Sequence, residues 1–530
     1  MNKDKEFWEE LNLHTQKIIE SDSDKKLIIA GPGTGETTSF KSIISSLGIN
    51  KNKCLVLTFI NNLKSDLEKD LSGLAEVFTF HGYCHYVLHS NANYRISLSG
   101  DFIYFPKIIE VIKSDWEIFN ETESPQFIKL MRTLNIGEDV QFFIERADYY
   151  DTVGYDDSVF RVHQCLFNDN NQKSYKLVIV DEYQDFNLLE VSLLKLISQK
   201  SPILITGDDD QALYLYLRNS DPKHIRDLFY DEDYEKFELP YCTRCTEVIV
   251  NAFNDVVETA KSCSKLSERI DKPFNYFPPL KKSDSEKYPK IKLIRTTIQN
   301  KKSKSSNYFG RYISNEICKI EKEEIKESKE KGFTTVLIIG SIQYLRQVHE
   351  YLTFQSHDCN DIKKDTDNLK LDLEDGMKIL KNNKESNLGW RVVLEISKPN
   401  FFEKVIKETK DLRKNLINII PEDFKEKILK ELEDFQVTKG VQHISDISEV
   451  EGALNPKIIL TSFEGAKGLS AQHVFIIGVQ DGDLPRNNNN PTDFEINKFL
   501  VALTRTRKQC HILYTTNFSG KIKKPSVFLN

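Results

Sequence analysis

A glycine-rich segment near the N-terminus combines the residue types that bind phosphate. The segment Gly31-Pro-Gly-Thr-Gly-Glu-Thr-Thr38 follows an apolar β-like run and precedes a helical stretch. This context is typical of a P-loop, in which glycines let backbone N–H groups turn onto phosphate oxygens at a helix N-terminus. A plain glycine-rich turn is the alternative. The predicted nucleotide contacts are Gly31, Gly33, Thr34, Gly35, Glu36, Thr37 and Thr38, and the Thr37 hydroxyl would also ligate Mg²⁺.

Position 36 of this loop carries the opposite charge from the one that the motif requires. The pattern G-x-x-x-x-G-K-[ST] places a lysine there to reach the β- and γ-phosphates, and this sequence has Glu36. An ammonium about 4 Å from a phosphate oxygen contributes about 4 kcal/mol of attraction at an effective dielectric constant of about 20. A carboxylate replaces this attraction with a similar repulsion. Since ~1.36 kcal/mol is a tenfold change in rate, we expect turnover to be at least ~100-fold lower.

A second acidic motif follows another apolar run. Asp181-Glu-Tyr-Gln-Asp185 comes directly after KLVIV at 176–180. An acidic pair at the end of a strand is typical of a Walker B site, in which Asp181 would hold Mg²⁺ and Glu182 would orient the attacking water. A solvated acidic turn is the alternative, and the P-loop upstream disfavours it.

Short apolar runs place these motifs at strand ends. Five such runs come early in the chain, at 26–31, 53–59, 75–80, 176–182 and 202–208. Runs of this length, separated by helical stretches, indicate a parallel sheet covered by helices on both faces, with the chemistry at the carboxyl ends of the strands. A second set follows at 290–297, 334–341, 457–465, 473–479 and 510–516. The sequence therefore predicts an α/β fold with two parallel sheets.

Two helical segments interrupt this α/β pattern. Aromatic-rich helical sequence between His85 and Tyr175 indicates an inserted subdomain, and charged, helix-like sequence from about 355 to 445 indicates a second one. The stretch 278–290 is predicted to be a loop or linker. The lysine-rich run at 301–305 fits a solvated loop better than a DNA contact.

Composition and charge limit the classes to which this chain can belong. Its 530 residues are 39% hydrophobic and 29% charged, which is ordinary for a soluble globular protein. No apolar run approaches the ~18 residues of a membrane span, and the charged start is not a secretory signal. Nine scattered cysteines fit a reducing cytosol better than a disulfide framework, so we expect a cytoplasmic protein without a membrane partner. The net charge of −7 argues against a globally basic nucleic-acid coat, but not against a local basic groove.

The motifs occur along the chain in the order of a known family. From residue 12 to residue 508 they resemble those of the UvrD/Rep/PcrA group of superfamily 1 DNA helicases. Besides the P-loop and Walker B site, the similar segments are Asn12–Gln16 (Q motif), Thr58–Asn61 (motif Ia), Thr79–His81 (motif Ib), Gly207–Gln211 (motif III), Leu239–Cys245 (motif IV), Gly465–Leu469 (motif V) and Val501–Arg505 (motif VI). One such match is weak, but seven in order are specific.

The resemblance implies how a nucleotide would be held. Gln16 would contact the adenine edge, and Gly468 would belong to the nucleotide site. Gln211 would link the γ-phosphate to the DNA groove. Arg244 and Arg505 would reach the γ-phosphate from the second domain, with Arg505 as the arginine finger. The implied cofactors are ATP and Mg²⁺.

The resemblance also implies a DNA substrate, as single strands or tailed duplexes, with 3′ to 5′ movement. Asn61 and His81 fall in the motifs that touch single-stranded DNA. Phe59 and Tyr216 are the candidates for stacking on its bases, each stacked base contributing ~1–3 kcal/mol. The alternative for Tyr216, in the run ALYLYL, is a core tyrosine.

The family fold implied is a pair of RecA-like P-loop NTPase domains with helical insertions. Residues 1–84 and 175–232 would form the first RecA-like domain and 85–174 its insertion, while 233–354 and 446–530 would form the second domain and 355–445 a reduced insertion. That second insertion keeps the fragment 388–399 but has no clear glycine-rich hairpin. We therefore expect weaker duplex gripping, and better translocation than unwinding.

Several positions depart from the family pattern. The family's arginine after the P-loop is Thr38, its tyrosine before the motif IV arginine is Thr243, and its glutamate after motif V is Ser470. We therefore expect looser base selectivity, with Tyr241 as a substitute stacking residue.

Two further groups have spacings that metal sites use. His81, His85 and His89 would share one helix face, and Cys242 and Cys245 have a zinc-like spacing. Neither group has further ligands at a familiar spacing, so incidental histidines and cysteines are the favoured interpretation.

Three hypotheses for function follow. The first is an ATP-dependent single-stranded DNA translocase or helicase that Glu36 makes hydrolysis-deficient. The second, from a resemblance to the helicase-like subunit of Gabija-type antiphage systems, is a nucleotide-gated DNA-sensing subunit acting with an OLD-family nuclease. The third is a DNA-binding pseudo-enzyme. A decayed site should have lost more than one position, so a single deliberate or sporadic substitution at Glu36 is favoured over natural decay.

Overall fold

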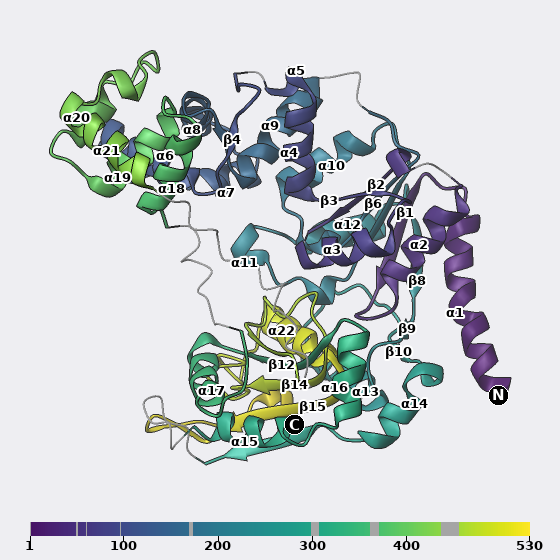
Figure 1. The fold of residues 1–530 in the computed structure, drawn as a ribbon. Coiled ribbons are helices and arrows are strands. Elements are labelled where there is room, and N and C mark those ends of the chain that lie inside the picture. Colours follow the sequence, from purple (N-terminus) through teal and green to yellow (C-terminus); the bar gives the residue numbers. More distant parts are fainter. Residues whose placement is uncertain are drawn as a thin grey trace.

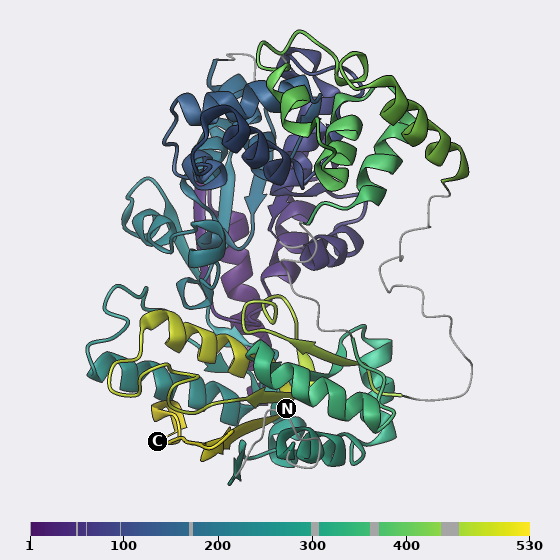
Figure 2. The same cartoon turned by 90° about the vertical axis from the view of Figure 1, so that its left-hand side faces the viewer.

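The chain forms two α/β domains and a helical region beside the first of them (Figures 1 and 2). This computed structural model describes residues 2–48, 51–59, 61–95, 97–168, 173–297, 307–360, 370–435 and 455–529, so the lysine-rich run at 301–305 lies outside the described residues. The N-terminal helix α1 (Asn2–Glu20) runs along the first domain towards the second.

The first α/β domain is built on a sheet of six parallel strands, as the early apolar runs predict. The strand order is β3 (Glu76–Thr79), β2 (Cys54–Thr58), β6 (Leu177–Val180), β7 (Ile203–Gly207), β1 (Lys25–Ala30) and β8 (Glu235–Leu239). Leu27 and Ile29 of β1 belong to the hydrophobic core on one face, and Ile28 and Ala30 belong to the core on the other. Burial of both faces explains why these strands are continuous apolar runs.

Strand β8 corrects the predicted domain boundary. Its residues lie after position 232, where the predicted second domain begins, but β8 pairs in parallel with β1 from Lys26↔Glu235 to Ala30↔Leu239. Its pattern of exposed and half-buried residues is that of an edge strand and lacks the apolar signal of the other five. The first α/β domain therefore extends to at least Leu239.

The second α/β domain contains a five-stranded parallel sheet formed by the later apolar runs. Its order is β11 (Lys292–Thr296), β15 (Thr506–Thr515), β14 (Ala471–Ile477), β12 (Thr334–Gly340) and β13 (Ile458–Thr461). One core joins this sheet to α13 (Glu247–Ser262) and α22 (Asp493–Thr504), and another joins it to α15 (Tyr308–Ile317) and α17 (Ile342–Phe354). Both predicted parallel sheets are therefore confirmed.

Capping residues fix where several helices begin. The remaining helices of the two domains are α2 (Glu36–Ser46), α3 (Asn61–Asp70), α4 (Phe80–Ser90), α10 (Leu188–Ser198), α11 (Leu215–Arg218), α12 (Lys223–Tyr230), α14 (Pro278–Lys287) and α16 (Lys322–Glu330). In a capping box, the N-cap side chain accepts a hydrogen bond from the N3 backbone N–H, and the N3 side chain accepts one from the N-cap backbone N–H. Such a box starts α10 at Asn187 and α22 at Thr492.

Helix α14 occupies 278–287, where a loop or linker was predicted. Prolines 278 and 279 mislead there, because proline is well tolerated in a first helical turn.

The two helical insertions pack against each other. The first contains α5 (Ala92–Arg95), α6 (Ile108–Asn120), α7 (Phe127–Arg132), α8 (Glu138–Tyr149) and α9 (Tyr155–Asn168), with the short pair β4 (Ile103–Tyr104) and β5 (Thr152–Val153). The second contains α18 (Leu373–Asn382), α19 (Asn387–Ser397), α20 (Phe402–Lys407) and α21 (Glu422–Asp434). Figure 2 shows the second insertion, in green, lying against the first, in dark blue.

A buried ion-pair network joins these insertions. Asp115 of α6 accepts hydrogen bonds from Arg146 of α8 and Arg391 of α19, each at 2.8 Å, and from the Tyr150 hydroxyl at 2.6 Å. All four side chains are buried, and Trp390 on α19 belongs to the same hydrophobic core as Val111 on α6. The second insertion is thus continuous with the first domain's core, although its sequence lies within the second domain.

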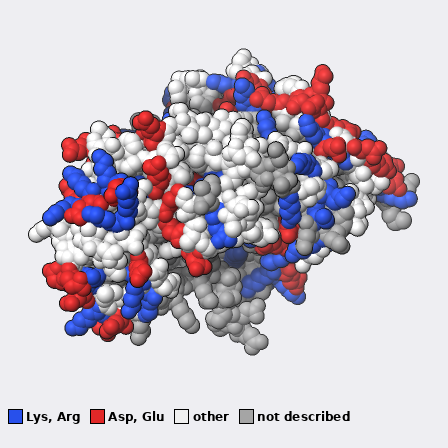
Figure 3. All heavy atoms as spheres, turned by 90° about the horizontal axis from the view of Figure 1, so that it is seen from above, with Lys and Arg blue, Asp and Glu red and all other residues white. Residues whose placement is uncertain are grey.

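Charged side chains are interspersed over the face drawn in Figure 3, around a largely uncharged middle. On this face, basic side chains lie among acidic ones. Among the described residues, no helix is long and apolar enough to cross a membrane.

Candidate nucleotide site and DNA-facing residues

The loop between β1 and α2 is shaped by two glycines. Gly33 and Gly35 have φ angles of 77° and 92°, a region that other residues rarely adopt. Thr34 donates its hydroxyl to the carbonyl of Gly31 at 2.9 Å and so closes the turn. The loop therefore leads directly into a helix N-terminus, which is the geometry that a phosphate group requires.

Glu36 begins α2, and its carboxyl group is turned towards the Walker B residues. Thr206 and the charges of Asp181 and Glu182 all lie close enough to affect its ionisation. Burial, followed by these two carboxylates, raises the pKa of Glu36 well above its usual range. The Thr206 hydroxyl donates to Asp181 at 3.0 Å. Glu36 therefore extends the acidic end of the sheet where a P-loop lysine would oppose it.

The Walker B pair lies at the carboxyl end of β6. Burial and the charge of Glu182 raise the pKa of Asp181 to about 7. Glu182 has a φ of 57°, a left-handed conformation that costs a non-glycine residue about 1–3 kcal/mol. Strain of this kind persists where the surroundings hold a side chain in place. The carboxylate of Asp181 and the hydroxyl of Thr37 are the oxygen donors that Mg²⁺ prefers, so the residues present fit that ion.

Lys467 was not among the predicted site residues, yet it reaches the Walker B motif from the second α/β domain. Its buried ammonium lies 3.2 Å from the Glu182 carboxylate and 2.5 Å from that of Asp185, and it donates to the Gln211 carbonyl at 2.8 Å. Although burial opposes ionisation of Glu182, Lys467 holds the pKa of Glu182 below its usual range. The available signal was its position within the motif V segment 465–469.

Three arginines lie near one another, and one of them contacts the phosphate loop. A Cβ atom on Gly33 would lie 2.6 Å from that of Arg244, so Arg244 rests directly on the loop. Arg505 follows α22 and donates to the Gln211 side-chain oxygen at 3.0 Å. Burial and the charge of Arg244 lower the pKa of Arg505 to about 9 and that of Arg507 to about 10. Arg507 was not among the predicted site residues. None of the three arginines forms an ion pair with a carboxylate in the described part of the chain, so together they can accept an anion.

The other positions considered for nucleotide binding are less closely gathered. Gln16 is exposed and donates to Glu20 of its own helix at 2.7 Å. Thr243 is bound to the phosphate loop, because its backbone N–H and its hydroxyl both donate to the Gly33 carbonyl. Thr38 is exposed in the first turn of α2, and Gly468, with a φ of 78°, adjoins Lys467.

Tyr241 is not a free stacking residue, which corrects the prediction made for it. Its ring packs edge-on against Phe7 of α1 and against Phe277, with centroids 5.8 and 5.7 Å apart. The tyrosine is buried in this cluster, which joins the N-terminal helix to the segment before α14. The sequence could not reveal this packing because the three aromatic rings come from distant segments.

The two predicted stacking residues differ in exposure. Phe59 is covered, since the Arg218 guanidinium lies 3.7 Å from its ring centroid and Phe186 packs beside it at 5.6 Å. Phe59 therefore lacks the free ring face that was expected. Tyr216 is 75% exposed and touches Phe494 of the second domain edge-on at 5.1 Å, which excludes the alternative of a core tyrosine.

Asn61 and His81 are the other two residues predicted to contact DNA. Asn61 begins α3, and its side chain lies outside the described residues. The His81 ring lies edge-on to Tyr155 at 5.4 Å. Burial, followed by the charge of Arg218, lowers the pKa of His81 to about 3. Its Nε2 atom is buried and has no hydrogen-bond partner among the described residues.

The histidine and cysteine spacings do not build a metal site in the described part of the chain. His85 and His89 contact each other through their Nε2 atoms at 3.1 Å, without a third ligand. Cys242 donates its thiol to the carbonyl of Pro32, and Cys245 donates its thiol to the carbonyl of Thr504. Both thiols thus bind backbone carbonyls, and that of Cys242 binds within the glycine-rich loop.

Known proteins resemble this chain over the same regions. Residues 15–216 match a family described as an AAA domain, and residues 157–517 match the UvrD-like helicase C-terminal domain. A probable DNA helicase II homolog of Mycoplasma genitalium is 22% identical and is aligned over 98% of this chain and 87% of its own length. The ATP-dependent DNA helicase Rep of Buchnera aphidicola is 22% identical, over 95% of this chain and 93% of its own length.

A third relative, the ATP-dependent DNA helicase PcrA of Staphylococcus aureus, is 26% identical over 47% of this chain and 40% of its own length. The AAA match contains the phosphate loop and Walker B motif, and the UvrD-like match contains Lys467 and the arginines that face them. Since the second match alone covers well over half of the sequence, this chain belongs to the UvrD-like helicase family.

Proposed function

We propose that this chain is built as an ATP- and Mg²⁺-dependent motor that moves 3′ to 5′ along single-stranded DNA, including the tail of a duplex. The observation that carries the proposal is the approach of Arg244, Arg505 and Lys467, from beyond the first sheet, to the phosphate loop and Walker B motif. The names of the relatives, which are DNA helicases, support DNA as the substrate.

A nucleotide between two domains can couple hydrolysis to movement. The γ-phosphate would attract Arg244 and Arg505 and so favour closure of the second domain on the first. Gln211, bonded to Arg505 and held by Lys467, would carry that closure towards exposed Tyr216. Loss of the γ-phosphate would weaken the attraction, and repeated closure would advance a strand bound across both domains.

The Walker B residues would supply the chemistry of the first domain. Glu182, kept ionised by Lys467, would orient the attacking water. Mg²⁺, held by Thr37 and Asp181, would neutralise charge on the phosphates. The strained backbone at Glu182 supports a role that fixes the direction of its carboxylate.

We further propose that Glu36 blocks hydrolysis in this form of the chain. Its carboxyl group adds a fourth acidic side chain beside Asp181, Glu182 and Asp208, and it takes the place of the cation that would bind the β- and γ-phosphates. The other predicted catalytic residues are present, which favours one substituted position in an otherwise intact motor.

The test compares ATP hydrolysis, with and without single-stranded DNA, by this chain and by its Glu36→Lys variant. We expect the variant to be at least ~100-fold faster and to be stimulated by DNA. Adding Glu182→Gln to the variant should abolish the gain, which controls for a contaminating ATPase. If Glu36→Lys is silent with DNA, the motor proposal fails for the isolated chain. Co-elution with a nuclease would then support the DNA-sensing subunit.

A further inference from the structure

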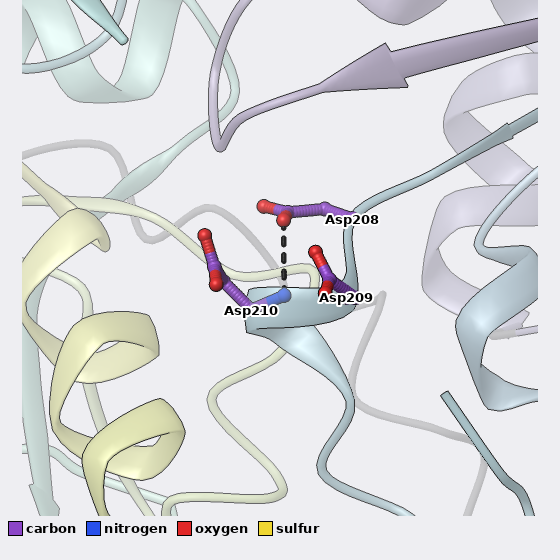
Figure 4. A group of neighbouring side chains, drawn as sticks. All are labelled: Asp208, Asp209 and Asp210. Carbon is purple, nitrogen blue, oxygen red and sulfur yellow. Dashed lines mark hydrogen bonds between the residues drawn. The ribbon is translucent and has the colours of Figure 1, made fainter. Parts of the chain in front are cut away.

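Three consecutive carboxylates form a compact buried group in the loop after β7. Asp208, Asp209 and Asp210 each have a carboxylate oxygen within 4.8 Å of those of the other two, and all three side chains are buried (Figure 4). Such a group could hold a divalent cation. The charge that it requires is, however, already supplied by the protein.

The ammonium of Lys272 occupies the centre of this group. It lies 2.9 Å from Asp208, 2.8 Å from Asp209 and 2.9 Å from Asp210, and its side chain is 1% exposed. Arg269 adds two hydrogen bonds to Asp210, at 2.7 and 2.8 Å, and the Arg226 guanidinium donates to Asp209 at 3.0 Å. Three cations therefore balance three carboxylates. Lys272 thus supplies at the centre of the group the positive charge that a bound metal ion would otherwise supply.

The loop held by Lys272 is bonded to the nucleotide site on two sides. Asp208 accepts a hydrogen bond at 2.8 Å from the side-chain amide of Gln211, whose oxygen binds Arg505. The Asp208 backbone N–H donates at 3.0 Å to Gln184, which donates at 2.6 Å to the Glu182 carboxylate. A shift of Asp208 would therefore disturb both the Walker B glutamate and the contact with the arginine finger.

Lys272 comes from the segment between α13 and β10 (Asn275–Tyr276), which also touches both domains. Phe274 belongs to the core of the second domain, and a Cβ on Gly31 of the phosphate loop would lie 2.7 Å from its ring. Asn497 of α22 donates to the backbone carbonyl of Asp209 at 3.3 Å. The three-carboxylate loop is thus bound by Lys272, two residues from Phe274 of the second domain's core, and by Asn497 of α22.

We propose that Lys272 is a positioning residue, whose ammonium replaces a metal ion and holds the Asp208–Asp210 loop so that Gln211 stays aligned between Glu182 and Arg505. This inference rests on the proposed motor function for its effect on turnover. Its effect on the position of the loop does not depend on that function.

The first experiment uses the Glu36→Lys chain as the parent and measures DNA-stimulated ATPase kinetics. Lys272→Met should lower kcat at least ~10-fold and change the KM for ATP less than ~3-fold, because the loop aligns the reaction rather than binding the nucleotide. Gln211→Ala should cause a similar loss. In the Gln211→Ala background, Lys272→Met should cause less than ~2-fold further loss, since both act through one contact. Losses that multiply would show a merely structural role and overturn the proposal.

The second experiment needs no turnover. Amide hydrogen exchange of the segment 207–213 should be at least ~10-fold faster in Lys272→Met than in the parent. The control is Lys261→Met, which removes an exposed ammonium that pairs with Asp271 near the same segment, and which should leave this exchange unchanged. Unchanged exchange in Lys272→Met would overturn the proposal even if the motor function holds, whereas a silent Glu36→Lys parent with faster exchange would overturn only the motor function.

Should Lys272→Met fail to fold, the charge-balanced variant Asp209→Asn with Lys272→Met replaces it, because it removes one carboxylate together with the ammonium. The same exchange and kinetic results are expected, and the same outcomes overturn the proposal. In Lys272→Ala, Ca²⁺ should occupy the vacated centre and raise Tm, while the parent should show no shift. A shift of equal size in both proteins would refute the substitution of ammonium for metal.

Discussion

Replacing Arg391 by methionine should loosen the attachment of the second insertion to the first. Arg391 and Asp115 are both fully buried, and the guanidinium donates to Asp115 and to Glu395, each at 2.8 Å. Methionine keeps the aliphatic volume and removes the charge, so the change isolates the ion pair from the packing of α19.

The expected loss of folding stability depends on how well the buried carboxylate of Asp115 is still paired after Arg391 is removed. Removing one partner of a buried ion pair costs about 3–5 kcal/mol, because the other charge remains buried without it. Asp115 keeps Arg146 at 2.8 Å and the Tyr150 hydroxyl at 2.6 Å, so we expect the lower end, about 3 kcal/mol.

Urea unfolding followed by tryptophan fluorescence measures this change. Trp390 lies on α19 and Trp116 on α6, so the two report on both sides of the contact, and Trp8 is replaced by phenylalanine in every protein compared. The control Lys378→Met breaks an exposed pair with Glu374 on α18 and should cost about 0.3–0.5 kcal/mol. If Arg391→Met costs no more than this control, the ion pair does not hold the insertions together and the reasoning is wrong.

Three further predictions concern the nucleotide, the DNA and pH. Glu36→Gln should tighten binding of a fluorescent ATP analogue at least ~10-fold while hydrolysis stays low, because repulsion is removed but no cation is added; unchanged affinity would show that Glu36 does not face the phosphates. Tyr216→Ala should weaken anisotropy-detected binding of a labelled single strand by about 5–150-fold, with little change in Tm since the side chain is 75% exposed; equal affinity would remove Tyr216 from the DNA path. Although burial opposes ionisation of Glu324, hydrogen bonds from His473, Tyr288 and Lys287 hold its pKa well below the usual range, so its stabilisation should be present above about pH 4.3 and be lost as pH falls towards the folded pKa. Glu324→Gln should flatten the pH dependence of urea unfolding over that interval, and a dependence identical to that of the parent would contradict the assignment.

The sequence alone predicted the features that short stretches of chain determine. The glycines of the phosphate loop, the acidic pair after β6 and the apolar runs of both sheets are local patterns, and the structure confirms the sheets that they predict. Edge strand β8 and helix α14 were missed for local reasons as well, because the first lacks an apolar pattern and the second begins with proline.

Only the tertiary structure decided which distant side chains share a buried environment. Lys467 lies 282 residues from Asp185, and Arg391 lies 276 residues from Asp115, so no local pattern could pair them. The cover over Phe59, the burial of Tyr241, the direction of Glu36 and the ammonium among three carboxylates have the same origin. A buried charge or ring is stable only beside a particular partner, and the packing of whole domains determines which partner that is.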